Sequence, residues 1–210
     1  MSEKEDIRLL AECGVATVYE ASGRKGLVDV PLIQIIPGSR VAGPAVTAAC
    51  GQDDNLMVHA VIEHLHEGEI LVIAMPDPTP VALVGELLAT QVAVRKAAGI
   101  LIDAAVRDVA ELVELGLPIW ARFIRVRGAG KTKVGSINKS VTVGGQPIRH
   151  GDIVVMDSDG AVVVDAARVD EVARASAARV DKETKFRAQL NEGKLSYDLH
   201  GLRSVVEGTK

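Results

Sequence analysis

Residues 85–108, GELLATQVAVRKAAGILIDAAVRD, join a helical pattern to a buried strand with very little chain between them. Leu87, Leu88 and Val92 have helical spacing, and Gly99 is well placed as a C-terminal cap. A helix over 86–97 would be about 18 Å long, and a strand over 99–103 about 17 Å long. If the strand runs back along the helix, the two lengths nearly cancel. The charged ends, Gly85-Glu86 and Arg107-Asp108, would then meet at one edge of the fold.

These two ends carry complementary chemistry. The free N–H groups of a helix start favour an anion, and Gly85 lets a ligand approach the backbone closely. Arg107 can hold a carboxylate with two parallel hydrogen bonds. Asp108 and Glu86 offer hard oxygen ligands for a divalent cation such as Mg²⁺. The pattern therefore predicts a pocket for a small carboxylate, such as a 2-oxo acid, beside a metal; a solvated Arg-Asp turn next to a helix-capping Glu is the alternative.

The rest of the chain alternates helices and strands early and is dominated by strands later. We expect helices over 4–22, 53–68 and 167–192, and strands over 40–50, 69–76, 117–128, 140–145 and 152–165. This order predicts an α/β sandwich with mixed sheets. With 210 residues, 48% of them hydrophobic, one domain is expected. We assign it to residues 1–166, followed by a helical tail over 167–210 that packs on the core or on a neighbouring subunit.

Composition excludes several classes of partner. Aromatic residues make up 2% of the chain and the net charge is -4, which argues against binding nucleic acid. No apolar run reaches the roughly 18 residues that cross a membrane. The charged N-terminus, MSEKEDIRLL, is unlike a secretory signal. Cys13 and Cys50 form neither a metal motif nor a disulfide framework. We therefore expect a cytoplasmic protein with two unpaired thiols.

Three further motifs are interpreted as structural. His59, His64 and His66 lie close together but lack a ligand spacing for zinc. DSDG (157–160) lacks the rest of a calcium loop and predicts a hairpin turn. GAGKTK (128–133) lacks the spacing of a phosphate-binding loop, so no nucleotide site is expected there.

The chain resembles the class II pyruvate aldolases of the 4-hydroxy-4-methyl-2-oxoglutarate / 4-carboxy-4-hydroxy-2-oxoadipate aldolase family. That family shares a superfamily with the regulator of ribonuclease activity A. Its signature is an acid, twenty residues and then Arg-Asp; here these are Glu86, which stands for the family's Asp, Arg107 and Asp108. Relatives commonly carry a glycine at Ala104-Ala105. The resemblance extends over ATVYEASGRKG (16–26), PGSRVAGPAVTA (37–48), DNLMVHAVIEHLHEGEILVI (54–73) and ETKFRAQLNEGKLSYDLHGLR (183–203).

The resemblance implies a swivelling β/β/α fold and a homotrimer or homohexamer with active sites between subunits. It implies that Asp108 holds Mg²⁺ or Mn²⁺, partly through waters, and that Glu86 orients a water on the metal. The pyruvyl group would be bound by Arg107 and by the backbone amides of Gly85, Glu86, Leu87 and Leu88. Glu20 and Glu183 would reach in from an adjacent subunit.

The function implied is metal-dependent retro-aldol cleavage of a 4-hydroxy-2-oxo acid to pyruvate and a second oxo acid. Oxaloacetate decarboxylation, which passes through the same enolate, is the expected side activity. Two alternatives remain: a non-catalytic, protein-binding regulator of the ribonuclease E type, and a related lyase acting on another 2-oxo acid. The acid-Arg-Asp trio and the long tail favour the enzyme.

Overall fold

The structure is a computed structural model that describes residues 2–208 of the 210-residue chain. The helices are α1 (Glu3–Cys13), α2 (Val15–Ala21), α3 (Leu56–Val61), α4 (Glu86–Val94), α5 (Val109–Leu115), α6 (Val169–Asn191), α7 (Ser196–Leu199) and α8 (Arg203–Glu207). The strands are β1 (Ile33–Gln34), β2 (Val41–Ala49), β3 (Ile70–Ala74), β4 (Ala82–Val84), β5 (Gly99–Val106), β6 (Ile119–Ile124), β7 (Ser136–Ile137), β8 (Val141–Val143), β9 (Gln146–Ile148), β10 (Ile153–Asp157) and β11 (Gly160–Val164). Single 3-10 turns follow α3 at 62–64 and precede α6 at 166–168.

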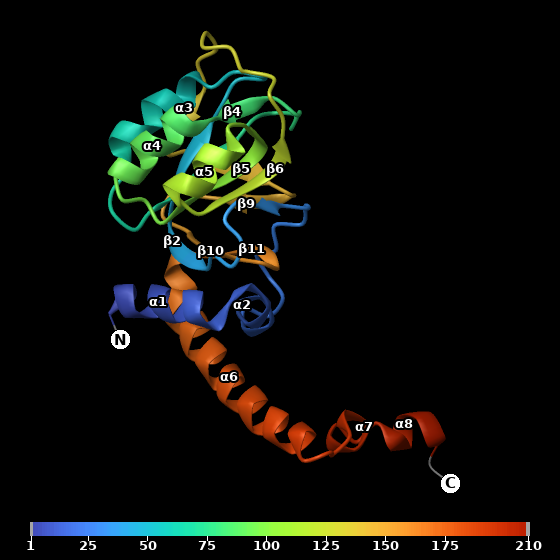
Figure 1. Ribbon diagram of the computed structural model, residues 1–210. Coiled ribbons are helices and arrows are strands. Elements are labelled where there is room, and N and C mark those ends of the chain that lie inside the picture. The colour runs from blue at the N-terminus through green and yellow to red at the C-terminus, as the bar shows by residue number, and fades with distance from the viewer. Residues whose placement is uncertain (1, 209–210) are drawn as a thin grey trace.

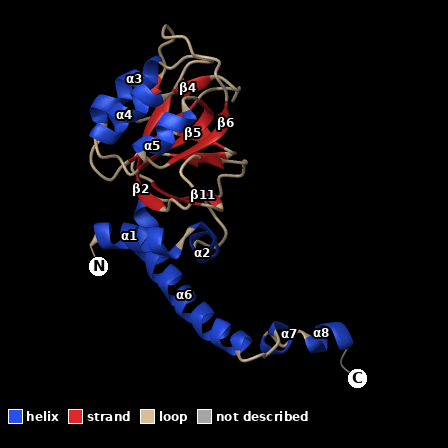
Figure 2. Cartoon of the chain, in the orientation of Figure 1, coloured by secondary structure: helices blue, strands red, loops and turns tan. Residues whose placement is uncertain are grey.

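A mixed sheet forms the centre of the molecule (Figure 2). Its main path runs β1-β6-β5-β3-β2-β10-β11, with β4 added beside β5 and β7 beside β2. β2, β3, β5 and β6 are parallel neighbours, whereas β1, β7, β10 and β11 pair in the antiparallel sense. β8 and β9 form a separate hairpin. The predicted mixed α/β fold class is confirmed.

Alternate residues of the parallel strands serve two different cores. Val46, Leu71, Ile100 and Ile102 face the layer of α3, α4 and α5 (Figure 1). Ala45, Val72 and Leu101 face the β8–β9 hairpin and Trp120 instead. Every residue of β3 and β5 is buried, as expected for parallel strands covered on both faces.

The helices at the two ends of the chain form a third layer. α1, α2 and the start of α6 pack against the β10–β11 hairpin through Leu10, Val18, Val155, Val162 and Val172. α6 then runs away from this layer, and α7 and α8 follow at its far end (Figure 1). No helix in residues 2–208 combines the length and apolarity that crossing a bilayer requires.

Three expected helices have other bounds in the structure, and the one expected over 53–68 is α3 followed by the 3-10 turn at 62–64. The helix expected over 4–22 divides at Gly14, whose φ of 83° ends α1 and starts α2. Asp157 explains the break, because its Oδ2 accepts a hydrogen bond from the amide of Val15 at 2.9 Å. α4 ends at Val94 rather than 97, because Lys96 adopts the left-handed conformation with φ 57°. Gly99 is therefore not the cap.

Gly99 instead begins β5, where a Cβ would lie 2.8 Å from the carbonyl oxygen of Pro118. β5 continues to Val106, three residues beyond the expected strand. Two elements beside it, β4 and α5, had no counterpart among the expected elements. The DSDG turn is confirmed as the tip of the β10–β11 hairpin, where Asp157 pairs with Gly160.

Candidate functional site

A βαβ unit brings the two ends of residues 85–108 together. β4 runs parallel to β5, Val84 pairs with Val106, and the amide of Arg107 donates to the carbonyl of Val84 at 3.1 Å. α4 connects the two strands on one face of the sheet, and the amide of Glu86 donates to Oδ2 of Asp108 at 3.1 Å. The helix start and the Arg-Asp pair are thus in direct contact, as predicted, but α4 is shorter and β5 longer than the lengths on which that prediction rested.

The Asp108 carboxylate occupies space that a side chain at position 85 would fill. A Cβ on Gly85 would lie 2.5 Å from Oδ2 of Asp108 and 3.1 Å from Nε of Arg107. Asp108 itself is left-handed, with φ 61° and ψ 45°, and begins α5. Asp tolerates this conformation better than most residues. Gly85 therefore serves close packing, and the turn at Asp108 aims its carboxylate at the helix start.

Arg107 is half-exposed, and its guanidinium faces the same space. Its Nε lies 3.6 Å from Oδ2 of Asp108, an ion pair with both side chains more than two-fifths exposed. Gly128 leaves room for the guanidinium, since a Cβ there would lie 3.2 Å from Nη1 of Arg107. The terminal guanidinium nitrogens therefore remain available to an external carboxylate.

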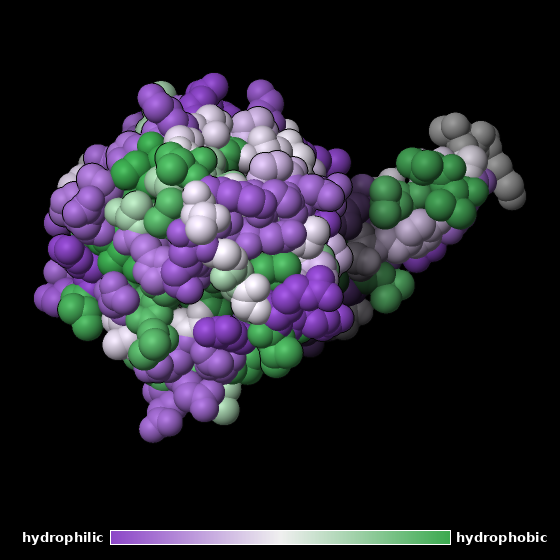
Figure 3. Space-filling model, turned by 90° about the horizontal axis from the view of Figure 1, so that it is seen from above, coloured by the Kyte–Doolittle hydropathy of each residue, from purple (hydrophilic) through white to green (hydrophobic). Residues whose placement is uncertain are grey.

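These groups open onto a cavity of about 180 Å³. It lies at the end of the molecule shown in Figure 3, where the surface is mostly hydrophilic with scattered apolar patches. Apart from Arg107, Asp108 and Gly85, its lining comes from the start of α4, from α3 and the residue before it, from β4, and from the loop that follows β6. These residues are Asn55, His59, Ala82, Leu83, Leu87, Leu88, Gly128, Ala129 and Lys131.

Asn55, in the pocket wall, carries a buried acceptor without a partner in the described part of the chain. Its Nδ2 donates to the carbonyl of Leu83 at 3.0 Å, which orients the amide. Its Oδ1 is buried and has no hydrogen-bond partner among the described residues. A buried acceptor left unpaired is costly. Oδ1 is itself enclosed by protein atoms, so the contribution of Asn55 to the pocket wall is a side chain held in place by Leu83.

Asp54 fixes the loop that forms the opposite wall. This carboxylate is almost fully buried, and its Oδ2 accepts from the amides of Thr132 at 2.6 Å and Lys133 at 3.1 Å. Its Oδ1 accepts from the amide of Leu56 at 2.9 Å. Burial acts to raise the pKa of Asp54, but the hydrogen bonds from Thr132, Leu56 and Lys133 outweigh it and hold the pKa below its usual value of 3.8.

The first turn of α4 divides its residues between the pocket and the core. Leu88 is buried and Leu87 is 76% exposed, and both line the pocket. The Glu86 side chain is not part of the lining, and its Oε1 accepts from the hydroxyl of Thr90 at 3.1 Å. The predicted trio is therefore adjacent, with Glu86 contributing its amide to Asp108 and pointing its carboxylate along the helix.

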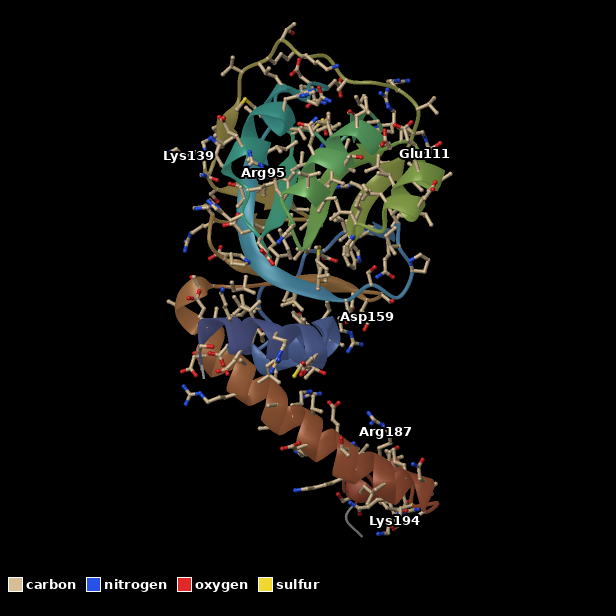
Figure 4. The ribbon with its side chains drawn as sticks, turned by 60° about the vertical axis from the view of Figure 1, so that its left-hand side comes forward. Arg95, Glu111, Lys139, Asp159, Arg187 and Lys194 are labelled. Carbon is tan, nitrogen blue, oxygen red and sulfur yellow. The ribbon has the colours of Figure 1, made fainter. Side chains whose placement is uncertain are left out.

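Glu20 and Glu183 lie elsewhere in the chain. Glu20 is on α2 and Glu183 is in the second half of α6. Arg179 connects them: its Nε lies 2.8 Å from Glu183 and its Nη1 3.9 Å from Glu20. Figure 4 shows Arg95, near the end of α4, in the main body of the molecule and Arg187 on the projecting part of α6. Glu20 and Glu183 thus lie close to each other, and neither lines the pocket of its own chain.

A divalent cation would find one carboxylate ligand in this pocket. Within residues 2–208, no three His, Cys, Asp or Glu side chains are grouped so that they could enclose a metal. Asp108 uses Oδ2 for the amide of Glu86, which leaves Oδ1 as a ligand. Mg²⁺ keeps several waters and is commonly bound by one or two carboxylates plus substrate oxygens. The open, partly exposed Asp108 carboxylate fits a hydrated ion of this kind.

The cysteines are unsuited to nucleophilic chemistry. Both are free, and burial raises the pKa of the Cys50 thiol to about 12. Burial also raises the pKa of Cys13. Because the thiolate is the reactive form, neither residue is activated at neutral pH.

Sequence reasoning missed the wall formed by Gly128, Ala129 and Lys131. The GAGKTK segment was considered only as a nucleotide loop, and it shows no phosphate-binding spacing. Its position depends on Asp54, 78 residues away from Thr132. No local pattern predicts such a contact; the one signal was a glycine-rich segment without an assigned element.

Comparison with known proteins gives consistent results. The model of the RraA-like family, described as Aldolase/RraA, matches residues 15–163. A candidate 4-hydroxy-4-methyl-2-oxoglutarate aldolase of Halalkalibacterium halodurans is 31% identical over 169 residues, which is 80% of this chain and 78% of that protein. Among solved structures, Streptomyces coelicolor RraAS2, described as an unusual member of the RNase ES inhibitor RraA protein family, superposes with a TM-score of 0.78. It is 27% identical, and the match covers 87% of this chain and 96% of that one.

An uncharacterised protein of Pseudomonas syringae gives a TM-score of 0.81 at 20% identity, covering 91% of this chain and 94% of that one. At this identity the likeness concerns the fold alone. Sequence similarity thus connects this chain to a relative with an aldolase name, and structural similarity connects it to a relative with an inhibitor name.

Proposed function

This chain belongs to the RraA-like Aldolase/RraA family, and we propose that it is a divalent-metal-dependent aldolase that releases pyruvate from a 4-hydroxy-2-oxo acid. The proposed substrate is of the 4-hydroxy-4-methyl-2-oxoglutarate or 4-carboxy-4-hydroxy-2-oxoadipate type. One observation carries the proposal: the guanidinium of Arg107, the carboxylate of Asp108 and the start of α4 meet at a single pocket.

Arg107 and the helix start account for substrate binding. The guanidinium pairs with the carboxylate of the pyruvyl group, and the amides of Leu87 and Leu88, which have no acceptor within the helix, face the same negative charge. Gly85 lets the substrate approach the backbone. Asp108 would hold Mg²⁺ or Mn²⁺, and the bound ion would supply Lewis-acid chemistry to the 2-oxo acid.

The reaction then needs a proton to leave the C4 hydroxyl and another to arrive at C3. A water assisted by a carboxylate removes the hydroxyl proton, and the C4 oxygen forms the new carbonyl. The C3–C4 bond breaks, and its electron pair becomes the enolate of pyruvate, whose charge Arg107 stabilises. Water protonates C3. The same enolate arises when oxaloacetate loses carbon dioxide, so we propose that decarboxylation as a side activity.

The intersubunit part of the proposal concerns Glu20 and Glu183. These acids are adjacent around Arg179, and neither lines the pocket of its own chain. We propose that in a homotrimer or homohexamer they approach the pocket of a neighbouring copy and supply the carboxylates that assist the water. Apolar side chains exposed on the tail, among them Leu195 and Val205, support contact with another copy.

Removal of the metal tests the proposal most directly. Pyruvate release from 4-hydroxy-4-methyl-2-oxoglutarate, followed with a coupled pyruvate assay, should stop in excess chelator and return with Mg²⁺ or Mn²⁺. Oxaloacetate should behave in the same way. Full activity in chelator would contradict a metal-dependent reaction, and pyruvate release from other 4-hydroxy-2-oxo acids alone would favour a related lyase.

A second candidate is a protein-binding regulator of ribonuclease E type. The similarity to RraAS2 over nearly the whole of that protein favours it. Such a protein would bind the ribonuclease through the surface of its oligomer and would need no metal. Binding to ribonuclease E in a pull-down, without pyruvate release from any of these substrates, would support this function over the aldolase.

A further inference from the structure

A second hollow opens on the side of the sheet that carries the β8–β9 hairpin. It measures about 430 Å³ and lies between the chain that follows β3 and the turn of the hairpin at Gly144. It shares no described lining residue with the pocket at Arg107. Two charged side chains of the central sheet, Asp103 of β5 and Arg122 of β6, are part of its lining. The hollow is therefore a separate place where ligand chemistry could act.

Asp103 is a buried carboxylate with an oxygen to spare. It is the one charged residue of β5, and its side chain is 3% exposed. Its Oδ1 accepts from Nη1 of Arg122 at 2.8 Å. Its Oδ2 accepts no hydrogen bond from residues 2–208 and is not enclosed, unlike the unpaired Oδ1 of Asn55. Because a buried ion pair is favourable only when its remaining lone pairs are also satisfied, Oδ2 is suited to a donor from outside the protein.

Arg122 contributes donors beside that oxygen. Its side chain is 29% exposed, and only Nη1 is used in the contact with Asp103. The other N–H groups of the guanidinium make no hydrogen bond to residues 2–208. A guanidinium has five N–H donors, enough for two carboxylates at once. The pair therefore presents a free carboxylate oxygen and free guanidinium donors to the same hollow.

An apolar compartment continues from this polar pair. A smaller hollow of about 240 Å³ shares Met75, Pro76 and Thr142 with the first. Its remaining lining is small and apolar, and consists of Ala49, Cys50, Ala74 and Val141. The joined hollows thus have one charged end and one apolar end.

We propose that the joined hollows bind a free α-amino acid with an apolar side chain, independently of the aldolase reaction. The ligand's carboxylate accepts from the free N–H groups of Arg122, its ammonium donates to Oδ2 of Asp103, and its side chain enters the apolar compartment. Asp29, exposed in the same lining, adds a second negative charge. Two carboxylates and one guanidinium disfavour a ligand that carries a carboxylate alone. An amine alone leaves the guanidinium donors unused.

Three compounds with the same hydrocarbon chain test this assignment in titration calorimetry. L-Leucine carries both charged groups, 3-methylbutylamine lacks the carboxylate, and 4-methylpentanoate lacks the ammonium. L-Leucine should bind about tenfold or more tighter than either of the others, since each of them loses one charge-assisted hydrogen bond. Equal affinities for the three compounds, or saturable binding of none, would overturn the site.

Two conservative variants assign the contacts. Asp103→Asn keeps an acceptor for Arg122 but removes the charge, so affinity for L-leucine should fall about tenfold while that for 4-methylpentanoate stays within about twofold. Arg122→Lys keeps the ion pair with Asp103 but loses the second set of donors, so L-leucine should then bind about as weakly as 3-methylbutylamine. Arg149→Lys, which alters the exposed pair of Arg149 with Asp165, is the matched control and should change none of the three affinities.

Arg107→Ala decides between this hollow and the pocket at the start of α4. It removes the guanidinium that would hold a carboxylate in that pocket, and it should leave the affinity for L-leucine unchanged. Loss of L-leucine binding in Arg107→Ala, or unchanged binding in both Asp103→Asn and Arg122→Lys, would overturn the proposal. Because the readout is binding, its outcome does not depend on whether the protein releases pyruvate.

Discussion

At the scale of single residues, the pocket depends on having a glycine, without a side chain, at position 85. Gly85 has an extended φ of -130°, so its role is purely steric. In Gly85→Ala the new methyl group would meet Oδ2 of Asp108 at 2.5 Å and force that carboxylate and Arg107 aside. Because a displacement of about 1 Å at a reacting centre can cost roughly a hundredfold in rate, we expect kcat/KM for pyruvate release to fall by about that factor.

The melting temperature provides the control for Gly85→Ala. Both displaced side chains are more than two-fifths exposed, so they can move towards solvent without leaving a void. The variant should melt close to the wild-type temperature. A variant with normal kcat/KM would mean that Asp108 and Arg107 do not need their observed positions.

Asp54 makes the loop beneath Lys131 sensitive to acid. Its pKa is lowered in the folded state, so it stabilises the fold fully above its unfolded value of about 3.8. This contribution is lost as the pH falls through the lower, folded value. Asp54→Asn should therefore unfold at a lower urea concentration than wild type at pH 7. The two midpoints should converge below pH 3.8, and a constant gap between them would contradict this account.

At the scale of elements, the β4–α4–β5 unit shows what local sequence can predict. The spacing of Leu87, Leu88 and Val92 indicated the helix, and the apolar run after Gly99 indicated the strand. The predicted meeting of the two ends is observed, although the expected lengths were wrong: the parallel pairing of β4 with the longer β5 brings the ends together. β4 and α5 were missed because a three-residue strand and a seven-residue helix carry too short a pattern to be recognised.

The walls of the pocket were beyond prediction for another reason. The Asp54–Thr132 contact joins residues 78 apart, and the Asn55 amide is oriented by Leu83, 28 residues away. Both contacts arise from the packing of the whole sheet, and no sequence pattern near either partner predicts them. The acid-Arg-Asp trio was found because its members border one supersecondary unit.

The length of α4 can be tested separately from its chemistry. Gln91 is exposed near the middle of the helix. Deleting it shortens the helix by about 1.5 Å and rotates the following residues by about 100°. We expect kcat/KM to fall by about a hundredfold or more. Gln91→Ala keeps the length and should retain normal activity; equal losses in the two variants would show that side-chain chemistry matters more than length.

At the scale of the whole molecule, the position of Glu183 leads to a complementation experiment. If Glu183 serves the pocket of a neighbour, subunits carrying Arg107→Ala and subunits carrying Glu183→Gln are each inactive alone. In mixed oligomers, some pockets pair an intact Arg107 with an intact Glu183 from the other chain. Co-expression of the two variants should therefore restore a measurable fraction of activity.

Separate expression and mixing at low concentration, where subunits do not exchange, provide the control. No recovery in co-purified mixed oligomers would mean that Glu183 has no role at a neighbouring site. Normal activity of Glu183→Gln on its own would lead to the same conclusion.

The left-handed backbone at Asp108 restricts how this protein can be re-engineered. Two independent demands apply at that position: a conformation with φ 61° and a carboxylate beside the helix start. Gly and Asn satisfy the conformation but bring no carboxylate, whereas Glu brings the carboxylate with less tolerance for the conformation. A library randomised at position 108 should therefore return almost only the parental codon. A search for altered metal preference should vary the surroundings of Asp108 and leave the residue itself in place.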